Sequence, residues 1–377
     1  MVATVARTAG FRAPAARRLV VKVGSALLVG PDGALRRDWL AGLVADIADC
    51  RAAGQEIVVV SSGAIALGAR RVALAKGGRA SLEDSQAAAA IGQILLAGAW
   101  GQLLEAHGLV AAQILVTLGD FEDRRRFLNA AATIDRLLAL GVVPILNEND
   151  TVATEEIRFG DNDRLAARAA QAAGANALIL LSDIDGLYTS NPATSADARL
   201  VERVDDIAAI QGMASTESAS GMGSGGMAAK VEAARIALAA GIPVAIAAGK
   251  PDHPLARFIA SGHGTIFTAP EAVGARKAWL AGRMQVEGRL QIDAGAAAAL
   301  IAGKSLLAAG VTDIAGRFRR GDAVDICAGG VAIARGLVAY DATDLVQIAG
   351  KRTDAIAAIL GYAPRSAVIH RDQMVML

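Results

Sequence analysis

The feature that most constrains the fold is a series of continuous apolar runs that alternate with helical patterns. Six runs rich in Val, Ile, Leu and Ala are predicted to be strands, at 18–23, 56–60, 109–116, 142–146, 177–181 and 243–247. Between them, apolar residues recur at helical spacing, as in 37–53, 65–104, 120–140 and 228–240. Strands that are apolar throughout are buried on both faces, as in parallel sheets covered by helices. The sequence therefore predicts an α/β domain with a mainly parallel sheet.

The C-terminal part of the chain has a different character. With 377 residues, the chain exceeds one typical core, so two or three domains are expected. From Ala275 onward the β-type runs are short, glycines are closely spaced, and Lys and Arg exceed Asp and Glu by four, whereas they trail by three before it. We expect a basic disordered tail over 1–16, an α/β domain over 17–270 and a small β-rich domain over 275–377.

Composition narrows the class of protein. Two cysteines, Cys50 and Cys327, are too few for a disulfide framework, which favours a reducing, cytoplasmic location. The arginine-bearing N-terminus lacks the continuous apolar core of a secretory signal. The longest uncharged stretch, 85–104, is interrupted by Gln86, Gln93 and Gln102, which favours a packed helix over a membrane span. The four histidines do not have metal-ligand spacing and are interpreted as structural.

Two clusters of Asn and Asp lie in the middle of the chain. Residues 147–150 follow an apolar run directly, and residues 160–163 precede an alanine-rich helical pattern. Polar residues at the carboxyl end of a parallel strand commonly bind a ligand. The alternative is a pair of turns, because Asn, Asp and Gly also dominate turns.

Two further segments follow strands and could contact an anion. Lys22 lies inside an apolar strand, where an unpaired charge is costly, and Gly24 follows it. The alternative is that Lys22 lies on an edge strand and its side chain points to water. Residues 61–64 offer hydroxyls and N–H groups between a strand and a helix, where they could instead simply cap the helix.

A glycine-rich segment opens the helical pattern at 228–240. Glycines before a helix N-terminus let backbone N–H groups approach an anion, and Lys230 is one turn inside. The alternative is a surface loop. Residues 221–226 match G-x-G-x-x-G but follow a polar segment, so a dinucleotide site is rejected. Residues 182–188 place carboxylates after the fifth strand, where they could contact a ribose or a metal-bound water, or form an Asp-Gly turn.

Together these segments resemble the amino acid kinase family, and within it the branch that phosphorylates glutamate. The matching segments appear in the family's order, at 21–25, 61–65, 147–150, 160–163, 182–188 and 225–230. The C-terminal part resembles a PUA domain. The resemblance implies a three-layer α/β sandwich and ATP-dependent phosphorylation, with Mg²⁺, of the side-chain carboxylate of L-glutamate. The product would be L-glutamyl 5-phosphate, made in the first step of proline synthesis.

The resemblance also implies roles for individual residues. Lys22 and Lys230 would contact the transferring phosphate, and Asp163 would position both lysines. Glutamate would be bound by Ser62, Asp150 and Asn162. Besides the two lysines, the nucleotide site would be lined by Ser182, Asp183, Ser224, Gly225, Gly226, Met227, Ala228 and Ala229. No protein ligand is assigned to the metal. The family often has hydroxyl residues where this chain has Ala228 and Ala229, and often Lys where this chain has Arg158.

Three alternatives stay open from the sequence. A sister kinase would act on aspartate, acetylglutamate, carbamate or a nucleoside monophosphate. An RNA-binding protein would act through the PUA-like part, which has few aromatics for base stacking and is therefore disfavoured. A catalytically dead homologue is disfavoured by the retained Lys22, Asp163 and Lys230. The resemblance further leads us to expect a homo-oligomer and feedback inhibition by proline, and no membrane partner.

Overall fold

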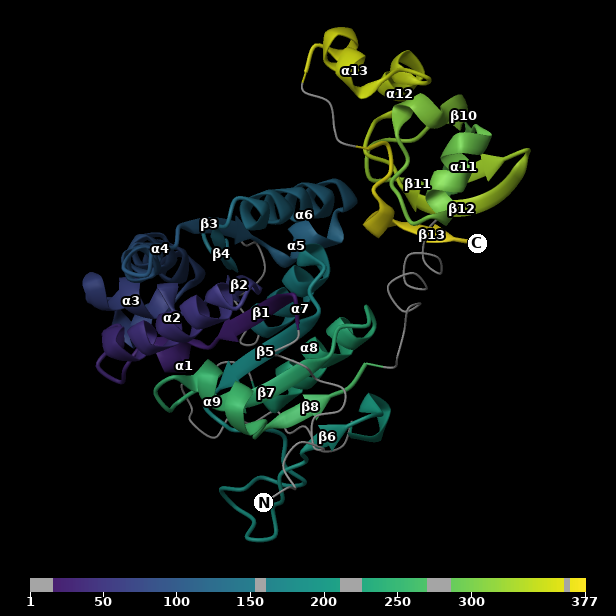
Figure 1. Cartoon of the computed structure of the whole chain (residues 1–377). Helices are drawn as coiled ribbons and strands as arrows, with labels where there is room; N and C mark the ends of the chain where they lie inside the picture. The colour runs from purple at the N-terminus through teal and green to yellow at the C-terminus, as the bar shows by residue number, and fades with distance from the viewer. Residues whose placement is uncertain (1–15, 153–160, 211–225, 270–285, 363–366) are drawn as a thin grey trace. The chain divides into compact units, whose positions relative to one another are not determined.

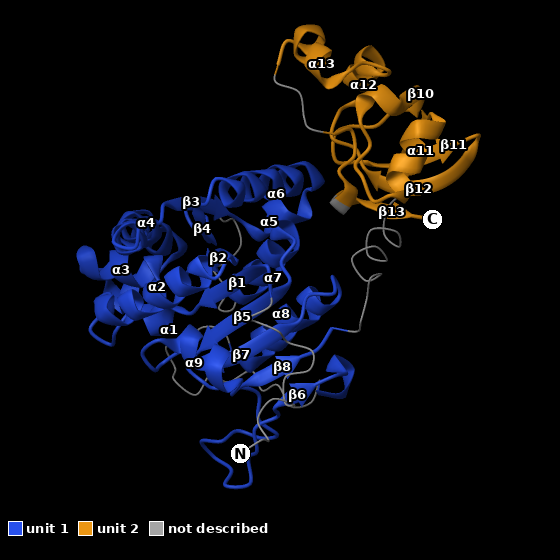
Figure 2. Cartoon of the chain, viewed as in Figure 1, with its two compact units in different colours: residues 1–271 blue, residues 272–377 orange. Residues whose placement is uncertain are grey.

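The chain forms two compact units. The computed structural model describes residues 16–152, 161–210, 226–269, 286–362 and 367–377. Unit 1 covers Met1–Glu271 and unit 2 covers Ala272–Leu377 (Figure 2).

Unit 1 is built on one eight-stranded sheet. Its strands are β1 (Arg18–Val23), β2 (Glu56–Val60), β3 (Ala111–Val116), β4 (Val143–Glu148), β5 (Ala177–Ser182), β6 (Arg203–Val204), β7 (Val244–Ala248) and β8 (Thr265–Phe267). They are ordered β3-β4-β2-β1-β5-β7-β8-β6. Every neighbouring pair is parallel except β7 and β8. The predicted α/β fold with a mainly parallel sheet is confirmed.

Helices cover both faces of this sheet (Figure 1). They are α1 (Ser25–Leu28), α2 (Arg37–Ala52), α3 (Ala64–Arg71), α4 (Leu82–Glu105), α5 (Leu118–Glu122), α6 (Arg124–Ala139), α7 (Asp161–Ala173), α8 (Met227–Leu238) and α9 (Pro254–Ser261), with short 3₁₀ turns at Ala75–Gly78 and Ile207–Ile210. One core joins the sheet to α2, α4 and α9, and a second joins it to α6, α7 and α8. Within β1, Leu19 and Val21 belong to the first core and Val20 to the second. This alternation produces the three layers.

The structure differs from the sequence-based expectations in its details. The helix predicted over 120–140 is two helices, because Asp123 caps the second, accepting a 2.9 Å hydrogen bond from the Arg126 N–H. The short strands β6 and β8 have no long apolar run and were not predicted. Strand β4 extends to Glu148 and β5 to Ser182, so part of each polar cluster lies in the sheet.

Helix α4 is the one helix in the described ranges that is long and apolar enough to cross a membrane. Its residues Leu96, Ala99, Trp100 and Leu104 are instead packed in the core of unit 1. This burial agrees with the expectation of a packed helix.

Unit 2 has a separate five-stranded sheet. Its order is β10-β9-β11-β12-β13, with β9 (Val286–Ile292), β10 (Val311–Gly316), β11 (Ala323–Ala328), β12 (Val331–Leu337) and β13 (Met374–Met376). Helices α11 (Ala294–Ile301), α12 (Ala342–Ile348) and α13 (Thr353–Leu360) complete it, with 3₁₀ turns at Ala308–Gly310 and Arg371–Gln373. Leu290, Ile326, Val338 and Leu345 are fully buried in its own core. The expected small β-rich fold is confirmed.

Candidate active site

Polar residues gather where the central strands of unit 1 end. Because parallel strands point the same way, their carboxyl ends share one edge of the sheet. Lys22 precedes the last residue of β1, Ser61 and Ser62 follow β2, Asn147 lies near the end of β4, and Ser182 ends β5. These strands are neighbours in the order β4-β2-β1-β5. Segments distant in sequence are thereby brought to one edge.

Asp163 bridges two buried lysines at this edge. Its Oδ1 lies 2.5 Å from Lys22 Nζ, and its Oδ2 lies 3.1 Å from Lys230 Nζ. The lysines come from β1 and α8, and Asp163 comes from the first turn of α7. Lys22 and Lys230 are only 6% and 5% exposed, and Asp163 is fully buried. Since β1 is central and paired on both sides, the edge-strand interpretation of Lys22 is wrong.

The surroundings shift the pKa values of Lys22 and Asp163. Burial lowers the pKa of the Lys22 ammonium below its ordinary value, an effect that Asp163 partly opposes and the like charge of Lys230 reinforces. Burial alone would raise the pKa of Asp163, but the two lysines outweigh it and hold that pKa below its usual range. Asp163 is therefore a carboxylate that pairs with both lysines.

A second cluster lies beside Asp163. Asn162 Nδ2 donates a 2.8 Å hydrogen bond to Ser62 Oγ, which joins α7 to the residue before the Gly63 cap of α3. The Oδ1 atom of Asn162 is buried and has no hydrogen-bond partner among the described residues. A buried acceptor left without a donor is costly, so it is a suitable contact for a ligand N–H group.

Asp150 lies just beyond β4 and is 8% exposed. Its charge acts on Arg79, whose pKa is lowered by burial, an effect that Asp150 partly opposes. Asp150 and Arg79 thus place opposite charges close together, as recognition of a zwitterion requires.

Two of the residues predicted to line a nucleotide site, Ser182 and Asp183, come at the end of β5, on the side of β1 away from β2. Ser182 Oγ donates to Asp183 Oδ1 at 3.2 Å, and the Ser182 carbonyl accepts a 2.6 Å hydrogen bond from the Gly249 N–H. Asp183 is near enough to Lys22 to raise its pKa. Gly226 is the N-cap of α8. Met227, Ala228 and Ala229 are the first residues of that helix, and Lys230 directly follows them. Ser224, Gly225 and Arg158 lie outside the described residues.

Two site-facing residues were not identified from the sequence. Gln93 and Trp100 of α4 hydrogen-bond Asn147 and Ser61 respectively. The signal available was Gln93 itself, a polar residue that interrupts a long uncharged run. Its partner is 54 residues away and no local pattern links the two.

The described residues contain no group of three or more His, Cys, Asp or Glu side chains that could hold a metal. His253 Nδ1 pairs with Asp46 at 2.7 Å, and His263 Nε2 pairs with Asp185 at 2.9 Å. Mg²⁺ bound with a nucleotide keeps several waters and needs only one or two carboxylates besides the phosphates. Asp183 is a carboxylate at this edge that would suit a water bound to the metal.

Comparison with known families agrees with this arrangement. The model of the amino acid kinase family matches residues 17–248, which include both lysines, Asp163 and the strand ends. The chain belongs to the amino acid kinase family. A second model, that of the PUA domain, matches residues 288–360 of unit 2. The predicted family and its C-terminal PUA domain are thus confirmed.

Members of this family with curated names resemble the chain over nearly its whole length. The glutamate 5-kinase of Sphingopyxis alaskensis is 64% identical over 96% of this chain and 97% of that protein. The glutamate 5-kinases of Zymomonas mobilis and Novosphingobium aromaticivorans are each 58% identical, over 97% and 96% of this chain and 93% and 96% of theirs.

Proposed function

We propose that this chain transfers the γ-phosphate of ATP to the side-chain carboxylate of L-glutamate, forming L-glutamyl 5-phosphate in the first step of proline synthesis. The observation that carries the proposal is the buried Lys22–Asp163–Lys230 bridge, in a chain that is 58–64% identical to glutamate 5-kinases. The cytoplasm is the proposed location.

The chemistry of a carboxylate acceptor suits these residues. A glutamate side chain has an ordinary pKa of about 4.3, so it is already ionised at neutral pH and needs no general base. Phosphoryl transfer then depends on positioning and on charge stabilisation. Lys22 and Lys230 supply positive charge for the transferring phosphate. Asp163 has a lysine on each oxygen, so it orients cations and is not available as a proton acceptor.

The groups beside the bridge suit the amino-acid end of the substrate. An α-ammonium group requires acceptors, and Asp150 and the buried Asn162 Oδ1 provide them. Ser62 is held against Asn162 at 2.8 Å, so both would contact the same substrate. These three residues keep their predicted role in glutamate binding as part of this proposal.

The first turn of α8 suits the nucleotide phosphates. Gly226, Met227 and Ala228 offer backbone N–H groups at a helix N-terminus, whereas the Ala229 N–H donates to the Gly226 carbonyl at 3.0 Å. Lys230 follows them. Ser182 and Asp183 would complete this side, and Asp183 would face Mg²⁺ through the metal's waters. When bound, Mg²⁺ neutralises phosphate charge. Ser224 and Gly225 belong to the same proposal from the sequence alone.

Hydroxamate trapping tests the reaction directly. Incubation with ATP, MgCl₂ and L-glutamate in hydroxylamine should yield γ-glutamyl hydroxamate, because an acyl phosphate reacts with hydroxylamine. Aspartate, acetylglutamate and carbamate serve as competing acceptors, and faster product formation with any of them would contradict the proposal. A parallel series with proline tests the expected feedback inhibition, and size measurement in solution tests the expected homo-oligomer.

A further inference from the structure

One helix hydrogen-bonds both loops of the candidate glutamate site. Gln93 Oε1 of α4 accepts a 2.6 Å hydrogen bond from Asn147 Nδ2 at the end of β4. Two turns later on α4, Trp100 Nε1 donates a 3.1 Å hydrogen bond to Ser61 Oγ after β2. Trp100 and Ser61 are fully buried, and Asn147 is 2% exposed. Since β2 and β4 are neighbours in the sheet, α4 fixes two adjacent strand ends.

The two residues that α4 hydrogen-bonds, Asn147 and Ser61, are close in sequence to residues proposed to bind glutamate. Asn147 also accepts a 2.9 Å hydrogen bond from the Glu148 N–H, so both ends of its amide are used within the protein. Asn147 therefore orients the backbone that leads to Asp150. Ser61 immediately precedes Ser62, whose hydroxyl accepts from Asn162. Each α4 side chain is thus one short segment away from a residue proposed to bind glutamate.

We propose that Gln93 and Trp100 are positioning residues that set the glutamate affinity of the site. This inference rests on the proposed function, and neither side chain is assigned a contact with the substrate. The lysines and the nucleotide-side residues lie on β1, β5 and α8, which these two hydrogen bonds do not reach. Loss of either hydrogen bond should therefore weaken glutamate binding and leave ATP binding nearly unchanged.

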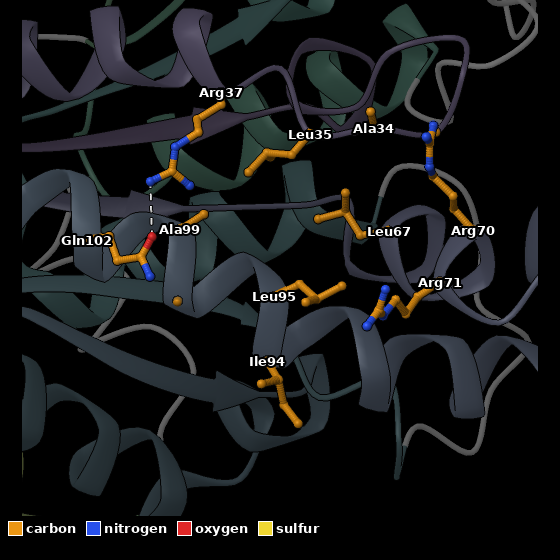
Figure 3. A pocket seen from close by; sticks show the side chains of 12 residues that line it. Ala34, Leu35, Arg37, Leu67, Arg70, Arg71, Ile94, Leu95, Ala99 and Gln102 are labelled. Carbon is orange, nitrogen blue, oxygen red and sulfur yellow. Dashed lines mark hydrogen bonds between the residues drawn. The ribbon is translucent and has the colours of Figure 1, made fainter.

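The opposite side of α4 offers a matched control. A pocket of about 600 Å³ is lined there by Leu35, Leu67, Ile94 and Leu95 together with arginines (Figure 3). Gln102, on the same helix, accepts a 3.0 Å hydrogen bond from Arg37 Nη2 at this exposed surface. Gln93→Leu and Gln102→Leu are thus the same substitution on one helix, facing the site in one case and the surface pocket in the other.

The experiment compares Gln93→Leu, Gln93→Glu, Trp100→Phe and Gln102→Leu with the wild type in the full chain. A net hydrogen bond of about 1 kcal/mol predicts that Gln93→Leu and Trp100→Phe each raise the KM for glutamate roughly five- to tenfold. Gln93→Glu keeps an acceptor for Asn147 and should restore most of the affinity. Gln102→Leu should match the wild type. The KM for ATP, and the Kd for glutamate from calorimetry, are measured for all five proteins.

The measurements can overturn the positioning role of Gln93 and Trp100, or the proposed function, separately. Equal rises in both KM values, or a Gln102→Leu effect as large as that of Gln93→Leu, would show a general structural role and overturn the inference. Unchanged glutamate binding in Gln93→Leu and Trp100→Phe would overturn it as well. A wild type that binds glutamate but forms no acyl phosphate would overturn the proposed function alone, since the calorimetric comparison still judges the positioning role.

Discussion

The residue that matters most at the site is Asp163, because it neutralises one of two buried lysine charges. Two ammonium groups this deeply buried would repel each other and would each lose hydration. A carboxylate with one oxygen on each lysine lowers both costs and fixes the distance between the cations. Under the proposed function, the transferring phosphate would meet cations already held in place, so little reorganisation would be needed during transfer.

Asp163→Asn therefore should damage both folding and catalysis. The amide keeps the shape but removes the carboxylate that pairs with Lys22 and Lys230, and breaking a buried ion pair costs about 3–5 kcal/mol. We expect a fall of that order in the free energy of unfolding, measured with urea, together with a large loss of kcat. Full stability in the variant would show that the buried charges are compensated by other groups.

The lowered pKa of Lys22 predicts an alkaline limit to activity. A lysine whose pKa is lowered in the folded protein becomes neutral as pH rises through that lowered value, and then no longer stabilises the phosphate. We expect kcat to fall with an apparent pKa below the ordinary lysine value of 10.5. The measurement is kcat against pH, with circular dichroism at each pH to exclude unfolding. An alkaline limb at or above 10.5 would contradict the assignment.

Prediction from sequence worked best for residues that carry a local signal. Lys22 is conspicuous as a charge inside an apolar strand, and the structure buries it as that reasoning required. The meeting of Asp163 with both lysines was implied only by the family resemblance, since the three residues come from different elements. Gln93 and Trp100 were missed because their partners, Asn147 and Ser61, are identified only when the helix is packed on the sheet.

At the scale of elements, the packing of α3 against α4 positions the site. The two helices touch through backbone atoms at Gly68 and Gly92. A Cβ on Gly92 would lie 1.7 Å from the Ala64 carbonyl oxygen, and one on Gly68 would lie 1.8 Å from that of Ala88. Ala64 is the first residue of α3 and is separated from Ser62 only by Gly63. Close contact here therefore keeps α4 at the distance that its hydrogen bonds to the site require.

Gly92→Ala should push the two helices apart. Overpacking commonly costs about 1–3 kcal/mol, and here the clash is with backbone, which cannot rotate away. We expect a loss of at least that size in the free energy of unfolding and a raised KM for glutamate. Gly98→Ala is the control, since a Cβ there has no neighbour within 4 Å and should stabilise α4 by roughly 0.5–1 kcal/mol. Equal stability of the two variants would disprove the contact.

The elements themselves were predictable wherever the apolar run was long. The central strands β1, β2 and β5 agree closely with their predicted ranges because both faces are buried. Strand β8 has three residues and pairs antiparallel to β7. Its pairing depends on tertiary packing, so no local sequence pattern predicts it. At α5 and α6, the capping hydrogen bond of Asp123 outweighed the continuous helical periodicity.

At the scale of the molecule, each unit has its own hydrophobic core, and two aromatic residues of unit 2, Phe318 and Tyr340, belong to that core. Phe318 and Tyr340 are 3% and 2% exposed, so neither face of their rings is open to a base. Among the described residues of unit 2 the remaining aromatic is Tyr362, which is 45% exposed and whose hydroxyl donates to Asp344 at 2.7 Å. Binding of single-stranded RNA usually recruits exposed aromatics. The expectation that RNA is not a partner of unit 2 stays a prediction.

The separate cores predict that unit 1 functions without unit 2. All the residues proposed to bind glutamate or ATP lie before residue 271, and the described ones rest on the two cores that flank the large sheet. A fragment of residues 1–271 keeps the whole large sheet and both of its cores, so we expect it to fold alone. We expect it to unfold in one cooperative transition and to form γ-glutamyl hydroxamate with a kcat close to that of the full chain. A folded fragment that binds glutamate but transfers no phosphate would instead assign part of the catalytic step to unit 2.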